Sequence, residues 1–152
     1  MAQPNSRYFD DLHLGEQFPI PSRTMTEALF AAFQLASADN HPIHYDVEYC
    51  RERGHPHMLA HGFQVLIQAA AGAGTFPHHI GDSLVGFIEQ KSSFLKPVYV
   101  GDTLYPMLEI VDLKPQNTTG VATLKATIRN QKDEVVLEGE QKFLLRRRPA
   151  AD

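Results

Sequence analysis

The sequence predicts an α+β fold in which a long antiparallel sheet wraps around one central helix. The character of the chain changes once, near residue 75, with helices and loops indicated before it and alternating strands after it. The segment that begins at His61, HGFQVLIQAAAGAG, is apolar on nearly every side, so other elements must cover it. The strands have one apolar face, which also needs a cover. Packing the helix against that face satisfies both requirements.

The composition indicates one globular domain that spans residues 1–152. The 152 residues are 43% hydrophobic and 21% charged, and they contain no internal repeat or linker. A chain of this kind buries a core without disulfides or metal. The net charge of -4 argues against a nucleic-acid partner, because phosphates attract a basic surface. The basic run at residues 146–148 is more typical of a solvated tail than of a phosphate site.

The same survey predicts a cytoplasmic protein with no membrane role. Cys50 is the only cysteine, so no internal disulfide can form, as expected in a reducing compartment. Residues 1–11 are polar where a secretory signal would be apolar. The longest apolar stretch, residues 63–73, contains two glutamines and is too short to span a bilayer.

Cap and stop residues place three helices in the first half of the chain. They cover residues 27–36 with Thr24 or Thr26 as the cap, residues 46–53 with Asp46 as the cap and Gly54 as the stop, and residues 61 to 72 or 74. Residues 18–24 predict a short strand, which Pro19 and Pro21 confine to an edge of the sheet. Residues 37–45 are expected to form an irregular loop.

Four strand-like runs follow in the second half, and we expect them to form a meander. Residues 121–129 and 135–145 alternate between apolar and polar side chains, and the polar turn at residues 130–133 makes them a hairpin. Residues 84–94 and 104–113 supply two more strands. The sheet is therefore expected to be long and polar on one face.

The loop at residues 36–46 contains an acid and a histidine that can converge on one small volume. Asp39 and His44 lie five residues apart, with Pro42 between them. Such a pair can hold a water, since the carboxylate accepts its proton and the imidazole, with an ordinary pKa of roughly 6.5, exchanges protons near neutral pH. A helix-capping aspartate and a surface histidine would give the same spacing, so the residues alone leave both interpretations open.

A second candidate is Gly62, at the start of the predicted central helix. Without a side chain, it allows a ligand oxygen to approach the backbone closely. Its N–H group could then stabilise negative charge on a carbonyl oxygen. The alternative is that Gly62 only permits close packing of the helix against the sheet.

Three motifs in this order resemble those of the MaoC-like dehydratase family. Residues 39–46, Asp-Asn-His-Pro-Ile-His-Tyr-Asp, resemble the family's "hydratase 2" signature, roughly D-x-N-P-[LIV]-H-x-D. Residues 60–62, Ala-His-Gly, resemble its "hHG" motif. Phe94 and Pro97, followed by Val-Gly-Asp-Thr at residues 100–103, resemble its later strand motif. Together the motifs cover almost the whole chain.

The resemblance implies a hotdog fold, usually dimeric, that binds an acyl thioester of coenzyme A or acyl carrier protein. The implied reaction of fatty acid metabolism is reversible hydration of a trans-2-enoyl thioester to an (R)-3-hydroxyacyl thioester. Asp39 and His44 would activate the water and exchange the proton at the α carbon. The Gly62 N–H would polarise the thioester carbonyl. No metal or redox cofactor is implied, and a homodimer or a dimer-based oligomer is expected.

Neighbouring residues supply the remaining site candidates. His61, Tyr45 and His41 flank the pair and are assigned to substrate binding. The chain departs from the signature at His41, where the family has Asn, and at Ala38, where a Gly commonly precedes the Asp. These departures leave the substrate more open than the reaction.

Other functions remain to be weighed. Eight histidines suggest a metal site, but their spacings match no standard zinc set, so none is predicted. An acyl-CoA thioesterase on the same fold would cleave the thioester without needing the Asp39–His44 spacing. A non-catalytic acyl-CoA-binding protein, or an inactive partner subunit, is the third alternative.

Overall fold

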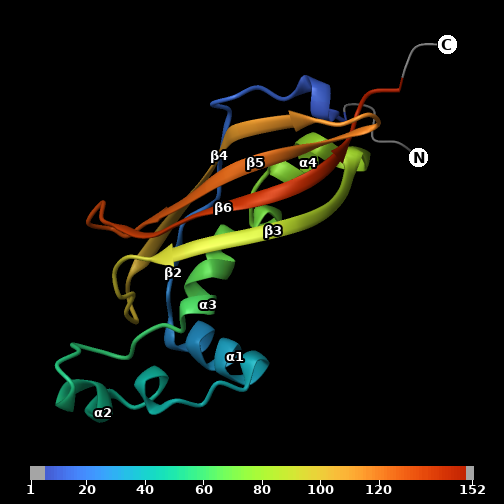
Figure 1. Cartoon of the computed structure of the whole chain (residues 1–152). Coiled ribbons are helices and arrows are strands. Elements are labelled where there is room, and N and C mark those ends of the chain that lie inside the picture. The colour runs from blue at the N-terminus through green and yellow to red at the C-terminus, as the bar shows by residue number, and fades with distance from the viewer. Residues whose placement is uncertain (1–5, 150–152) are drawn as a thin grey trace.

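An antiparallel sheet is the largest element of the computed structural model, which describes residues 6–149. Figure 1 shows its long strands passing over α3, with α1 and α2 at one end of the molecule and both termini at the other. The order across the sheet is β1-β4-β5-β6-β3, and the short β2 pairs with β4. The strands are β1 (Gln17–Pro19), β2 (Arg23–Thr24), β3 (Leu84–Phe94), β4 (Thr103–Pro115), β5 (Thr119–Arg129) and β6 (Val135–Arg146).

The predicted meander is right for three strands and wrong for the fourth. β4, β5 and β6 are joined as consecutive antiparallel neighbours. β3 does not pair with β4, which follows it in sequence, but lies beside β6 at the far edge of the sheet. Gly139 permits this close pairing, because a Cβ there would lie 2.1 Å from the carbonyl oxygen of Lys91. β3 is therefore an edge strand.

The helical segments precede β3 and are short. Four are α-helices and five are 3-10 turns, within residues 6–149. The α-helices are α1 (Glu27–Ser37), α2 (Val47–Glu52), α3 (Gly62–Leu66) and α4 (Phe76–Ile80). The 3-10 turns are η1 (Phe9–Asp11), η2 (Pro42–His44), η3 (Ile67–Ala69), η4 (Ala71–Ala73) and η5 (Gly81–Ser83). In the described part of the chain, no helix is long and apolar enough to cross a membrane.

The predicted helix caps agree with the structure. The Thr26 hydroxyl accepts a hydrogen bond from the backbone N–H of Leu29 at the start of α1, so Thr26 rather than Thr24 is the cap. The Asp46 carboxylate accepts from the N–H groups of Glu48 and Tyr49 at the start of α2. Thr26 fixes the start of α1, whereas Asp46, two residues after His44, fixes the end of the loop between α1 and α2.

The central helix is shorter than predicted, because it breaks at Ala70. α3 ends at Leu66 and continues only as a 3-10 turn, after which Ala70 is extended, with ψ at 124°. The Gln141 side chain of β6 donates a 2.8 Å hydrogen bond to the carbonyl of Ala69, so that carbonyl has a partner outside the helix. The glycines that follow are weak helix formers and do not restore the helix.

The core lies between the sheet and α3, as predicted, but one side of α3 is uncovered. Alternate residues of β5 are fully buried, which confirms the face predicted from alternation; they are Ala122, Leu124, Ala126 and Ile128. Phe63 of α3 is 72% exposed, and Ile67 beside it is half-exposed. Several apolar side chains of the edge strand β3, among them Phe87 and Ile88, are exposed as well. An apolar helix face and an unpaired strand edge are thus both open in the single chain.

Candidate active site

The loop that joins α1 to α2, residues 38–46, is here called the dyad loop. Ala38 ends α1 in the left-handed region, with φ at +59°, and turns the chain away from the helix. One carboxylate oxygen of Asp39 accepts a hydrogen bond from the His41 N–H at 3.3 Å. His41 Nδ1 in turn accepts from the Ile43 N–H and caps η2, which the sequence did not predict within this loop. These local bonds give the loop a defined shape.

Asp39 and His44 come together in this loop, as their spacing suggested. Asp39 Oδ2 lies 3.9 Å from His44 Nε2. The other ring nitrogen, His44 Nδ1, lies 2.6 Å from the carbonyl oxygen of Leu59. A carbonyl can only accept, so Nδ1 carries the proton and the lone pair of Nε2 faces the carboxylate. His44 is therefore oriented as a base.

The two side chains differ in their access to solvent. The Asp39 side chain is 54% exposed, whereas that of His44 is 11% exposed. Burial lowers the pKa of His44 below its ordinary value. The neighbouring His61 and His41 rings lower this pKa further, while the bond to Leu59 and the charge of Asp39 oppose the shift. The net lowering of the His44 pKa favours a neutral imidazole, which can accept a proton at neutral pH.

His61 joins this pair from the start of α3. Its ring stacks on that of His44, with centroids 3.5 Å apart and an interplanar angle of 18°. Its Nε2 lies 2.9 Å from the carbonyl oxygen of Asp39 and 4.0 Å from Oδ2 of the same residue. The His61 side chain is only 3% exposed. It therefore contacts both members of the pair but presents little surface to a substrate.

These three side chains are also the set that could hold a metal ion. One ligand atom from each of Asp39, His44 and His61 lies within 4.8 Å of the others, a convergence that the sequence spacing did not predict. His61 Nε2, however, donates its proton to the Asp39 carbonyl, so it has no lone pair for a metal in this arrangement. A metal would require His61 Nε2 to lose that proton, whereas proton transfer between His44 and Asp39 does not.

Gly62 begins α3 next to a small cavity. As the first residue of the helix, its N–H lies outside the helix's own hydrogen-bond ladder. A Cβ at this position would lie 3.4 Å from the Phe94 ring at the end of β3. The adjoining cavity has a volume of about 320 Å³, and its lining includes Gly62, Val65 and Phe94. Two of the sequence motifs therefore meet at this cavity.

A second cavity, here called the apolar cavity, follows further along the same two segments. Its volume is about 460 Å³, and it lies between residues 66–72 and the strands β3 and β6. Along α3 the lining passes from Gly62 to Leu66, while along β3 it passes from Phe94 back to Phe87. Because the two segments run in opposite directions, the cavities follow one another along a line between them.

The remaining candidates have more ordinary surroundings. Tyr45 is half-exposed at the end of η2. Cys50 is fully buried, and its thiol donates to the Ile43 carbonyl at 3.1 Å, which fits a packing role. Sequence reasoning missed the part that the Leu59 carbonyl plays in orienting His44. A backbone carbonyl carries no side-chain signature, so nothing in the sequence could have indicated it.

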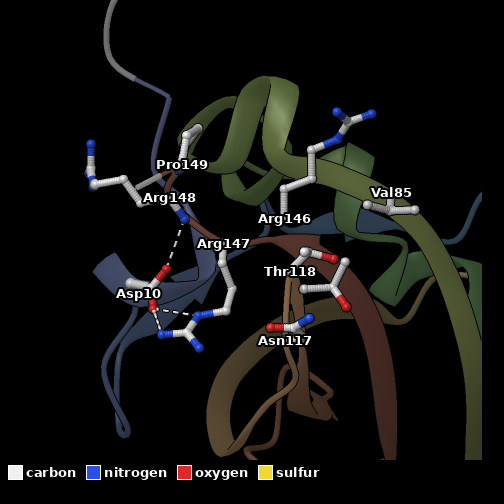
Figure 2. Close-up of a pocket in the computed structure, with 9 residues that line it drawn as sticks. Asp10, Val85, Asn117, Thr118, Arg146, Arg147, Arg148 and Pro149 are labelled. Carbon is white, nitrogen blue, oxygen red and sulfur yellow. Dashed lines mark hydrogen bonds and ion pairs between the residues drawn. The ribbon is translucent and has the colours of Figure 1, made fainter. Parts of the chain in front are cut away.

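The basic run forms ion pairs rather than the solvated tail that was expected. Figure 2 shows Arg147 directed at Asp10, while Arg146 points away from both. Arg147 Nε lies 2.9 Å from Asp10 Oδ1, and an Arg148 guanidinium nitrogen lies 2.5 Å from Asp11 Oδ2. These arginines line a hollow of about 870 Å³, but two of their charges are neutralised. The run therefore ties the end of β6 to η1.

Comparisons with known proteins find similar sequences and structures over most of the chain. A family model described as a MaoC like domain matches residues 12–131. The (R)-specific enoyl-CoA hydratase of Rhodospirillum rubrum is 26% identical over 137 residues, which cover 88% of each chain. The solved structure of a monoamine oxidase regulatory protein from Archaeoglobus fulgidus superimposes with a TM-score of 0.88 at 30% identity, covering 98% of this chain and 100% of that one.

A second solved structure identifies the fold. It is a conserved hypothetical protein from Mycobacterium tuberculosis with a double hotdog fold, related to this chain at 28% identity with a TM-score of 0.80. The match covers 99% of this chain but 47% of that one. The sheet and α3 of this chain thus form a hotdog fold, which corresponds to about half of the double fold.

Proposed function

The chain belongs to the MaoC-like domain family, and on that premise we propose that it is a hydro-lyase that reversibly hydrates a trans-2-enoyl thioester to an (R)-3-hydroxyacyl thioester. The similarity to an (R)-specific enoyl-CoA hydratase supports hydration of this general kind. The observation that carries the proposal is the Asp39–His44 pair, whose facing atoms are 3.9 Å apart with the His44 lone pair between them.

This separation suits a water held by both residues. It is too long for a direct hydrogen bond, but both atoms can bond to one oxygen at about 2.8 Å each. As the water oxygen forms its bond to the β carbon, His44 Nε2 takes one of its protons. The electron pair of the double bond moves onto the thioester carbonyl as an enolate. Asp39 and His44 then return a proton to the α carbon, so one water is added and the enzyme is unchanged.

Gly62 is proposed to stabilise the enolate. Its N–H can donate to the thioester oxygen, where negative charge develops in the transition state. The cavity of about 320 Å³ beside it would take the thioester group. We place the acyl chain in the apolar cavity, since its lining matches a hydrocarbon chain. The carrier would be coenzyme A or acyl carrier protein, and the reaction uses no metal or redox cofactor.

The three flanking residues would take different roles. Tyr45 is half-exposed and remains the candidate for substrate contact. His41 caps η2 and would shape the dyad loop instead. His61, which is buried against both Asp39 and His44, would position them more than it contacts substrate. The lone, buried Cys50 suits a reducing compartment, so a cytoplasmic location is proposed with this function.

The active unit is proposed to be a homodimer of one-domain chains, each spanning residues 1–152. An unpaired edge strand of eleven residues invites pairing with another strand. Phe63 of α3 and Ile67 of η3 are exposed, in the segment whose sequence requires cover on every side. A second copy that pairs along β3 would cover both surfaces. Light scattering coupled to gel filtration should therefore give twice the mass of the chain.

One assay tests the proposed reaction against its alternatives. Crotonyl-CoA should lose its enoyl absorbance without release of free thiol. Asp39→Asn should lower the rate by about 10²- to 10⁴-fold, the usual contribution of a general acid or base. Its thermal unfolding temperature should stay near that of the wild type, because the Asp39 side chain is half-exposed. Asp112→Asn, the same change on an exposed strand position, is the control and should retain full activity.

Two other outcomes would each support an alternative function. Thiol release at a rate unaffected by Asp39→Asn would indicate a thioesterase. Binding of the thioester without either reaction would indicate a non-catalytic acyl-CoA-binding protein.

A further inference from the structure

The apolar cavity is lined by two polar side chains that lie side by side on neighbouring strands. Gln90 of β3 and Gln141 of β6 are direct partners in the strand register, and both line the cavity. Gln141 is only 3% exposed. The other lining residues in the described chain are apolar or glycine, among them Leu66, Phe87 and Phe143. A buried amide in such surroundings is costly unless its polar atoms find partners.

Three of the four N–H groups of this glutamine pair are bonded to the protein. Gln141 Nε2 donates to the Ala69 carbonyl at 2.8 Å. Gln90 Nε2 donates to the Lys91 carbonyl at 2.8 Å and to the Ser92 hydroxyl oxygen at 2.7 Å. Each amide also has an oxygen that accepts hydrogen bonds. The bonds made by the nitrogens fix which end of each amide is the oxygen.

The two amide oxygens remain available to a ligand. Neither Oε1 receives a hydrogen bond from residues 6–149, yet neither is sealed inside the protein. Gln64 differs, because both polar atoms of its amide are buried without a partner and out of reach. Within residues 6–149, the glutamine pair therefore offers two acceptors from adjacent strands and one free donor, the second N–H of Gln141.

We infer that the glutamine pair recognises a hydroxyl group carried on the acyl chain of the substrate. The inference rests on the proposed function, since it takes the apolar cavity as the acyl site. A carboxylate would be repelled by two carbonyl oxygens, and no cation among the described lining residues would neutralise it. An ammonium group would lose its hydration with no acid to pair with. A hydroxyl is neutral, so it can donate to one amide oxygen and accept from the remaining N–H of Gln141 without any counter-charge.

The expected preference is moderate. A net hydrogen bond between neutral groups changes the free energy by an amount that corresponds to roughly 3- to 10-fold in an equilibrium constant. A methyl-ended chain of equal length fills the cavity but leaves the acceptors without a partner. We therefore expect the wild-type kcat/KM to favour the hydroxylated chain by about 10-fold at the chain length that reaches Gln141.

The test compares pairs of substrates that differ only at the chain end. The trans-2-enoyl-CoA thioesters of six, eight and ten carbons are each assayed with a terminal hydroxyl and with a terminal methyl group. Gln141→Leu should lower the ratio of the two kcat/KM values to about one, mainly by slowing the hydroxylated substrate. A ratio taken from one preparation is independent of the fraction that is folded.

Two further variants separate recognition from structure. Gln141 also donates to the Ala69 carbonyl where the helix breaks, and Gln141→Leu removes that bond. Gln90→Leu leaves it intact and should still reduce the ratio. Gln17→Leu, the same change on the exposed strand β1, should leave the ratio as in the wild type.

The outcomes distinguish this inference from the proposed function. Wild-type enzyme that hydrates crotonyl-CoA but shows no hydroxyl preference at any length overturns the inference alone. The same holds if both Gln141→Leu and Gln90→Leu keep the wild-type ratio. If the wild-type enzyme hydrates neither crotonyl-CoA nor any of the six thioesters, the proposed function is overturned, and the inference with it.

Discussion

The sheet and the dyad loop are held in place by different forces. The inner face of β5 is buried completely, and its strand pairs with β4 on one side and β6 on the other. The dyad loop is mostly exposed and is held by hydrogen bonds, two of which join a histidine ring to a backbone carbonyl of a distant segment. Those two bonds join His44 to the Leu59 carbonyl and His61 to the Asp39 carbonyl. The sheet therefore sets stability, whereas a small number of polar contacts sets the geometry of the site.

The largest effect is expected in the sheet. Leu124→Ala removes a fully buried side chain from β5 and should lower the free energy of unfolding by about 2–5 kcal/mol. Denaturant unfolding measures this loss. The activity per folded molecule should change little, because Leu124 is not among the residues that line the two cavities of the candidate site. The matched control is Leu35→Ala on α1, where the side chain is 87% exposed and the expected change is within about 0.5 kcal/mol.

An equal loss of stability in both leucine variants would contradict the comparison. It would mean that burial does not distinguish the sheet from the helices around the loop.

The second effect belongs to the loop and concerns pH. His61→Asn removes the stacked ring that lowers the pKa of His44, so that pKa should rise. Neutral His44 is the proposed base, and the rate therefore falls as the pH drops through its pKa. The acid limb of the kcat/KM profile should move to higher pH, and the rate at neutral pH should fall by about 10-fold, the lower end of an acid–base contribution.

A pH titration of kcat/KM checks this prediction, with His13→Asn at an exposed turn as the control. An unchanged profile together with a reduced rate would assign His61 a purely structural role. Unchanged kinetics would remove it from the site.

The smallest effect is expected where the loop leaves α1. Ala38 has a left-handed φ of +59°, which costs a residue with a Cβ roughly 1–2 kcal/mol. Ala38→Gly relieves this strain but adds freedom to the unfolded chain, which offsets about 0.4–1 kcal/mol. Thermal unfolding should therefore show a stabilisation of about 0–1.6 kcal/mol. A clear destabilisation would show that the Ala38 methyl makes a contact worth more than the strain.

Local signals in the sequence were enough to predict much of the fold. Alternation identifies the buried face of β5, and cap residues locate the starts of α1 and α2, because each depends on neighbours close in the chain. The spacing of Asp39 and His44 also suffices to bring them together, since both belong to one short loop. The dependence is local in every case, so the sequence carries the signal directly.

Tertiary structure decided the contacts between distant segments. The strand-like sequence of β3 does not say which strand lies beside it, and β6 rather than β4 takes that place. The break in the central helix depends on Gln141, which lies 72 residues beyond the carbonyl it binds. The stacking of His61 on His44 likewise joins a helix start to a loop. Sequence by itself determined the long strands, the starts of α1 and α2 and the catalytic candidates. Their neighbours depend on long-range packing, which leaves no periodic pattern in the chain.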